Sequence, residues 1–197
     1  ELATPEAVAA DPQLLPFLNH YFADGAIDLN WYRRCFSDFA GHRISGDVDP
    51  NLYILPEQGI VGLAQIMPEL KVMIVVRHPL KRAWSHLKML MTSRFGDKAP
   101  TLSLGDLRLV VTDKEIIRKS TYSNILPVWQ AAFGDRLMLY SYDRMCRNPQ
   151  EVVANTLDFI GVKDLPIMMP ASNVGASWSM PKELYDLAPE IYRSELE

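Results

Sequence analysis

Hydrophobic positions along the chain follow two kinds of pattern. Short apolar runs occur at 72–76 and 137–141, and neither alternates regularly with polar residues. Runs of this length and kind are typical of buried parallel strands. Stretches at 29–40, 79–91 and 149–160 instead carry their apolar residues at helical spacing. Strands that alternate with helices predict an α/β fold, in which helices flank a mostly parallel sheet.

Capping and turn residues mark the remaining elements. Thr112 with Glu115 resembles a capping box and begins a predicted helix to about Phe133, kinked near Pro127 and closed by Gly134. The other predicted segments are a short helix at 4–10, a short strand at 42–48, a helix at 60–70 interrupted by Pro68, a mobile loop at 92–110, the end of the 149–160 helix at Gly161, and a final helix from about Lys182.

Composition limits the classes of function. The 197 residues, 48% of them hydrophobic, predict a single domain over 1–197 with a real core. A net charge of −4 argues against a general surface for nucleic acid or anionic membrane, so an anion site needs a local basic cluster. No apolar stretch is long enough to span a membrane. The only cysteines, Cys35 and Cys146, form neither a disulfide framework nor a metal-binding spacing, and they predict a reducing, cytoplasmic setting.

Candidate chemistry gathers in the strand, loop and helix at 72–91. Arg77 follows the strand directly, and ligands of open α/β sheets bind beyond the carboxyl ends of the strands. Ser85 lies eight residues later on the polar face of the helix, together with Lys81 and Lys88. A guanidinium and a hydroxyl near a helix N-terminus suit a phosphate group. The alternative is a solvated basic helix face that happens to follow a strand.

The residues of this segment resemble a known motif. Residues 72–86 read V-M-I-V-V-R-H-P-L-K-R-A-W-S-H, which is similar to the 3′-phosphate motif of the sulfotransferases that use PAPS (3′-phosphoadenosine 5′-phosphosulfate). The positions that match are Arg77, Pro79, Arg82, Ala83, Ser85 and His86, whereas His78 departs from the usual Asn or Asp. In that family the first Arg and the Ser hold the 3′-phosphate of PAPS, so the resemblance implies these roles for Arg77 and Ser85.

Weaker segments in the same order extend the resemblance over about 12–195. They are Asn30–Phe36, Gly46–Tyr53, the set Tyr122, Leu126 and Trp129, the stretch Leu139–Pro149, and Asn173 with Met180 and Pro181. The resemblance implies a fold like that of the P-loop NTPases. It also implies transfer of a sulfuryl group from PAPS to a hydroxyl or amine, with PAP (3′-phosphoadenosine 5′-phosphate) as product. Plain core packing is the alternative for the aromatic residues of these segments.

The resemblance also suggests a base and a neighbour of the adenine. Asp47 matches the Glu that takes the acceptor proton in the carbohydrate branch, although its side chain is one methylene shorter. The alternative for Asp47 is a turn cap before Pro50; His42 and His86 are the other candidate bases. Tyr142 either faces the adenine, as the matching Tyr does in cytosolic members, or plugs the sheet edge.

One element of the family pattern is not found. The segment K-x-G-[TS]-[TS], which grips the 5′-phosphosulfate, has no match here, and residues 1–16 resemble the helix and turn that follow it. We therefore expect the sequence to lack the N-terminal strand and P-loop of the family. Two alternatives stay open: another P-loop-type transferase such as a small-molecule kinase, and a non-catalytic domain of the same fold. The acceptor, a hydroxyl on a small molecule, a glycan or a carrier, and the oligomeric state are not readable, and the chemistry requires no metal.

Overall fold

The computed structural model describes residues 31, 34, 44–95, 103, 105, 108–109, 112–163 and 179–196. The chain forms two compact units, Glu1–Asp49 and Pro50–Glu197. In the first unit Trp31 and Arg34 are helical, as the pattern at 29–40 predicts. The predicted helix at 4–10, the candidate base His42 and Asn173 of the resemblance lie outside the described residues. The prediction of one domain over the whole chain stays a prediction.

The predicted strand at 42–48 is wrong over its described part. Residues 44–49 have no regular secondary structure, and every one of them is exposed. Gly46, Asp47 and Pro50 are turn-forming residues, and a strand needs a partner for its backbone groups. The apolar side chains of Ile44 and Val48, 41% and 95% exposed, therefore have no sheet to pack on among the described residues.

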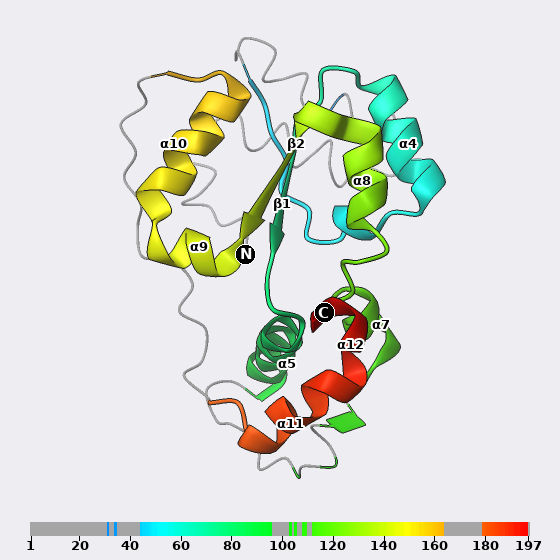
Figure 1. Cartoon of the computed structure of the whole chain (residues 1–197), viewed down its shortest axis with the longest axis vertical. Coiled ribbons are helices and arrows are strands. Elements are labelled where there is room, and N and C mark those ends of the chain that lie inside the picture. The colour runs from blue at the N-terminus through cyan, green and yellow to red at the C-terminus, as the bar shows by residue number, and fades with distance from the viewer. Residues whose placement is uncertain are drawn as a thin grey trace. The chain divides into compact units, whose positions relative to one another are not determined.

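Two parallel strands, β1 (Val72–Val76) and β2 (Leu137–Ser141), form the sheet at the centre of the second unit (Figure 1). Their register pairs Val72 with Leu137 and Val76 with Ser141. This confirms the predicted α/β fold, with a parallel sheet flanked by helices. The pattern predicted strands that are buried on both faces. In β1 one face is buried at Ile74, whereas Met73 on the other face is 46% exposed.

One face of β1 packs against α4 (Glu57–Ile66) and α8 (Leu126–Phe133). The buried members of this cluster are Ile60, Ile74, Trp129 and Phe133. The indole N–H of Trp129 donates to the carbonyl oxygen of Tyr53, at 2.8 Å, so the ring is buried without leaving a polar atom unsatisfied. Trp129 is thus a core residue. Its bond also fixes the short 3₁₀ helix η2 (Leu52–Ile54), which carries Tyr53.

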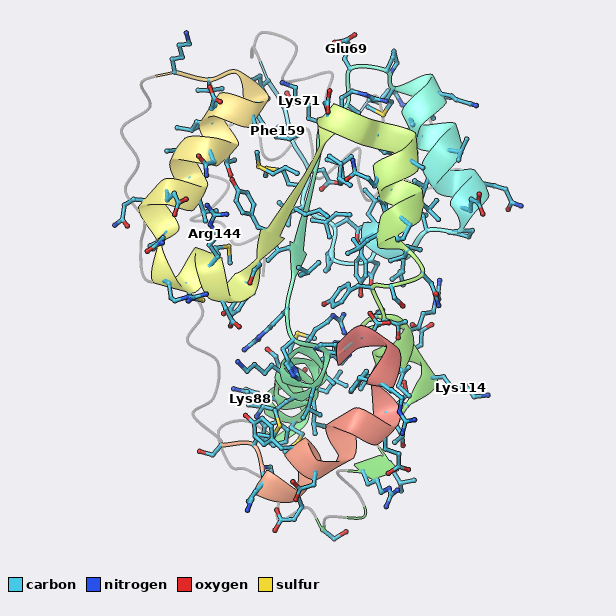
Figure 2. The ribbon with its side chains drawn as sticks, in the orientation of Figure 1. Glu69, Lys71, Lys88, Lys114, Arg144 and Phe159 are labelled. Carbon is cyan, nitrogen blue, oxygen red and sulfur yellow. The ribbon has the colours of Figure 1, made fainter. Side chains whose placement is uncertain are left out.

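Helix α10 (Pro149–Ile160) is attached to the sheet by contacts at its two ends. The hydroxyl of Tyr140 in β2 donates to the carbonyl oxygen of Val152, at 3.2 Å. At the other end, the Nζ atom of Lys71, the residue just before β1, lies 5.4 Å from the centre of the Phe159 ring (Figure 2). The predicted bounds of this helix are confirmed, and Gly161 ends it with a φ of 79° that favours glycine.

A second core forms on α5 (Pro79–Phe95). The predicted apolar stripe is buried throughout: Leu80, Ala83, Trp84, Leu87 and Met91. It packs against α7 (Lys114–Arg118) through Ile116, against α11 (Lys182–Ile191) through Leu184, and against Tyr192 at the bend between α11 and α12 (Arg193–Leu196). The chain passes from β1 to this second core through Arg77 and His78, so the loop at the strand tip is held from both sides.

The predicted helix from Thr112 to Phe133 is instead two helices. Asp113, not Thr112, caps α7, because its carboxylate accepts from the backbone N–H groups of Glu115 and Ile116, at 2.9 and 3.2 Å. The Thr112 hydroxyl turns back and donates to the carbonyl oxygen of Arg108, at 2.8 Å. Pro127 lies in the first turn of α8, where its missing N–H costs nothing, rather than at a kink.

Three further boundaries differ from the predictions. Helix α5 runs to Phe95, and Gly105, Arg108 and Leu109 are helical, so the predicted loop at 92–110 is wrong at these positions. Helix α4 ends at Ile66, before the residue that precedes Pro68. Helix α9 (Tyr142–Arg147) was not predicted. None of the helices in the described part has the length and apolar character of a membrane span.

Candidate functional site

A cavity of about 190 Å³ lies at the carboxyl end of β1. Its lining comes from η2, the β1 tip, α5, the turn before α8, and α9: Tyr53, Val75, Arg77, Arg82, Tyr122 and Tyr142. The cavity therefore brings together two of the residues singled out from the sequence, Arg77 and Tyr142. Ser85 is not part of the lining, and Asp47 belongs to the other unit.

Arg77 is held at the strand tip by two aromatic side chains. Its backbone N–H donates to the phenol oxygen of Tyr122, at 3.4 Å, and its guanidinium carbon lies 4.3 Å from the centre of the Tyr142 ring. Its Nε is buried, and none of the described groups accepts a hydrogen bond from it. A buried donor without an acceptor is costly, so this guanidinium is suited to a ligand that supplies one.

Tyr142 begins α9 directly after β2. A hydrogen bond with Cys146, assisted by burial, raises the pKa of its phenol, which keeps the ring neutral beside Arg77. An exposed ion pair links helix α9 to helix α5, because Lys81 Nζ lies 3.8 Å from Asp143 Oδ2. The strand–helix junction thus presents the flat face of Tyr142 to the guanidinium.

Arg82 and Tyr53 were not singled out as site residues, although Arg82 belongs to the motif at 72–86. Arg82 Nη1 donates to the hydroxyl of the fully buried Ser120, at 3.3 Å, which in turn donates to the carbonyl oxygen of Ile116, at 2.7 Å. Burial raises the pKa of Tyr53 to about 12, although the charge of Arg82 and its hydrogen bond to the phenol oppose the rise.

Glu195 of α12 fixes the turn that carries Tyr122. Its Oε2 accepts from the backbone N–H groups of Tyr122 and Ser123, at 2.6 and 2.9 Å, and its Oε1 accepts from the Ser123 hydroxyl. Three donors on one carboxylate are typical of a charge-assisted cap. The C-terminal helix therefore supports the wall of the cavity, because the Tyr122 phenol contacts the backbone of Arg77.

Glu195→Gln is expected to lower the free energy of unfolding by about 1–3 kcal/mol, because the amide keeps one acceptor but loses the charge that serves three donors. Urea denaturation measures this difference. The matched control is Glu190→Gln, which removes an exposed ion pair with Arg108 and should cost about 0–1 kcal/mol. Equal losses in the two variants would contradict the role given to Glu195.

The remaining candidates lie outside the cavity lining. Ser85 is half-buried on α5, three residues after Arg82 and so close to the same face of the helix. Burial, then the charges of Arg82 and Lys119, lower the pKa of His86, so its imidazole is neutral at neutral pH. Asp47 is exposed in the first unit. Within the second unit the cavity therefore brings together Arg77 and Tyr142, whereas Ser85 lies outside its lining.

Comparison with known proteins finds a matching family model and matching solved structures. Residues 62–170, which are 109 of the 197, match the family model described as a sulfotransferase domain. The crystal structure of a sulfotransferase from Alicyclobacillus acidocaldarius has a similar fold, with a TM-score of 0.64 and 20% sequence identity. The similarity covers 85% of this chain and 68% of that one. None of the curated proteins matches the sequence.

Proposed function

The chain belongs to the sulfotransferase family, and we propose that it transfers a sulfuryl group from PAPS to a hydroxyl or amine acceptor and releases PAP. Family membership favours sulfuryl transfer over the two alternatives, a small-molecule kinase and a non-catalytic domain. The nucleotide and the acceptor belong to the proposal. The observation that carries it is Arg77, a guanidinium at a strand tip on the wall of a cavity, whose buried Nε has no acceptor among the described residues.

Arg77 is the proposed ligand of the 3′-phosphate of the nucleotide. A phosphate oxygen would accept from its Nε, and the planar guanidinium can offer a second N–H in parallel. Helix α5 begins at Pro79, so its first N–H groups and its positive end lie close by and favour an anion. Stacking on Tyr142 supports this role, because it limits the orientations of the guanidinium before the ligand binds.

Ser85 and Tyr142 complete the proposed nucleotide contacts. The Ser85 hydroxyl, one helical turn beyond Arg82, is the proposed second donor to the 3′-phosphate. Tyr142 is proposed to border the adenine as well as to orient Arg77; its neutral phenol and flat ring suit stacking on a base. The role of Ser85 comes from the motif at 72–86, and that of Tyr142 from the resemblance to cytosolic members of the family.

The proposed chemistry is an in-line displacement at sulfur. The acceptor oxygen or nitrogen bonds to sulfur as the bond from sulfur to the 5′-phosphate oxygen breaks, and the acceptor proton passes to a base. Such transfers depend on positioning and on charge stabilisation at the peripheral oxygens. Asp47 is the proposed base, and the acceptor is a hydroxyl on a small molecule, a glycan or a carrier.

A thermal-shift comparison of two nucleotides tests the proposed function. PAP is expected to raise the melting temperature, because a ligand at 100 times its Kd stabilises the folded state by about 2.7 kcal/mol. ATP with Mg²⁺ is expected to leave it unchanged, since it lacks a 3′-phosphate. Stabilisation by ATP–Mg²⁺ without any effect of PAP would replace the proposal with phosphoryl transfer.

A further inference from the structure

The C-terminal segment carries a carboxylate that the proposed chemistry does not use. Glu195 of α12 is half-buried, and it accepts from the backbone N–H groups of Tyr122 and Ser123 and from the Ser123 hydroxyl. It lies 73 and 72 positions away from these two residues in the chain. Side chains that cap a turn in this way are usually its close neighbours in sequence. The conformation of this turn therefore depends on how the C-terminal segment packs.

Tyr192 fixes the C-terminal segment by contacts of its own. Its side chain is 1% exposed and packs against Leu80 and Ala83 of α5. Its phenol also shares a hydrogen bond with the hydroxyl of Ser120, which is fully buried. The core thus places the Glu195 carboxylate relative to α5, and the loss of its charge should leave the segment attached.

The turn that Glu195 caps carries a wall of the cavity. The Tyr122 ring borders the cavity beside Tyr53, with ring centres 6.2 Å apart. Its phenol oxygen accepts from the backbone N–H of Arg77, at 3.4 Å, and burial raises the pKa of the phenol, which keeps it neutral. A continuous set of contacts therefore runs from the C-terminal carboxylate, through Tyr122, to the backbone of Arg77 at the tip of β1.

We propose that Glu195 is a positioning residue for nucleotide binding, because it holds the Tyr122 phenol against Arg77 before the ligand arrives. The inference rests on the proposed function and extends it to a residue outside the cavity lining. A site already held in its binding geometry loses less conformational freedom when a ligand binds, so its affinity is higher. Since coupling of this kind is reciprocal, bound nucleotide should hold α12 more firmly in turn.

A double-mutant cycle on the affinity for PAP tests the proposal. Glu195→Gln is expected to weaken PAP binding by at least about threefold, because the turn loses its charged cap. In a Tyr122→Phe background, which lacks the phenol oxygen, the same change should weaken PAP binding by at most about half that factor. A merely structural role would give equal factors in the two backgrounds. Equal factors, or a loss below about threefold in the single variant, would overturn the proposal.

Glu190→Gln is the matched control for this cycle. Glu190 lies on α11, where its exposed carboxylate pairs with Arg108, and neither residue lines the cavity. The same carboxylate-to-amide change should leave the PAP affinity within about twofold of the wild type. A loss in this control as large as that in Glu195→Gln would assign the effect to net charge and would also overturn the proposal.

Hydrogen exchange in the wild-type protein measures the reciprocal effect without any variant. Saturating PAP should slow amide exchange in α12 by at least about threefold more than in α10, which is attached to the sheet instead. Equal slowing in the two helices, or none in α12, would overturn the proposal even if Glu195→Gln does not fold. A wild type that binds no PAP removes the proposed function itself, whereas one that binds PAP without this coupling removes only the role of Glu195.

Discussion

Replacing Arg77 by alanine is expected to weaken PAP binding by about 2–4 kcal/mol, a loss of roughly 30- to 1000-fold in affinity. The substitution removes a charge-assisted, two-pronged contact to the 3′-phosphate and leaves the Tyr142 ring without its cation. Isothermal titration with PAP measures the loss. Nucleotide affinity should suffer far more than fold stability, because the Nε of Arg77 has no partner among the described residues to lose.

Arg108→Ala is the matched control for this variant, since it removes an exposed arginine that pairs with Glu190 and does not line the cavity. Its PAP affinity should stay within about twofold of the wild type. An Arg77→Ala protein that binds PAP as tightly as the control does would contradict the assignment of Arg77 to the 3′-phosphate.

Asp47→Asn is expected to reduce turnover by about 10²–10⁴-fold, because an amide cannot take the acceptor proton. Affinity for PAP should change by less than about twofold, since the proposed base contacts the acceptor and not the nucleotide. The measurement is the initial rate of transfer of labelled sulfate from PAPS, with an acceptor first identified for the wild type among sugar and alcohol hydroxyls.

Asp49→Asn serves as the control, because Asp49 lies in the same exposed segment and has the same charge. It should retain most of the wild-type turnover. Normal turnover of Asp47→Asn, or equal losses in the two variants, would mean that another residue is the base.

The elements with clear local signals were predicted well. The apolar runs at 72–76 and 137–141 are strands with those bounds, and Pro79 and Gly161 mark a helix start and a helix end as expected. Each of these signals acts within a few residues: a proline in the first turn, a glycine at positive φ, an unbroken apolar run. Contacts from distant parts of the chain did not change the structure that these local signals predict.

The errors fall where neighbouring residues compete or where pairing is non-local. Thr112 and Asp113 can both cap a helix, and the structure uses Asp113 because the Thr112 hydroxyl is bonded to the preceding turn. The run at 42–48 has a mixed apolar pattern, but a strand exists only with a partner, and no local signal reports one. The turn-forming residues Gly46, within the run, and Pro50, just after it, predict the irregular structure correctly.

The candidate site was predictable only in part, for the same reason. Arg77 could be found from its position at a strand end and from its motif, and Tyr142 from the following strand. The rest of the cavity lining could not be predicted in the same way. Tyr53, Arg82 and Tyr122 come from separate elements, and only the packed core brings them together. Glu195, at the far end of the chain, acts on Tyr122 through backbone bonds that carry no sequence signature.

The most direct measurement is a crystal structure of the protein with PAP bound. It should show the 3′-phosphate in the cavity at the end of β1, within hydrogen-bond distance of Arg77 Nε. A nucleotide bound elsewhere on the chain, or one bound with its 3′-phosphate turned away from the Arg77 guanidinium, would contradict the account.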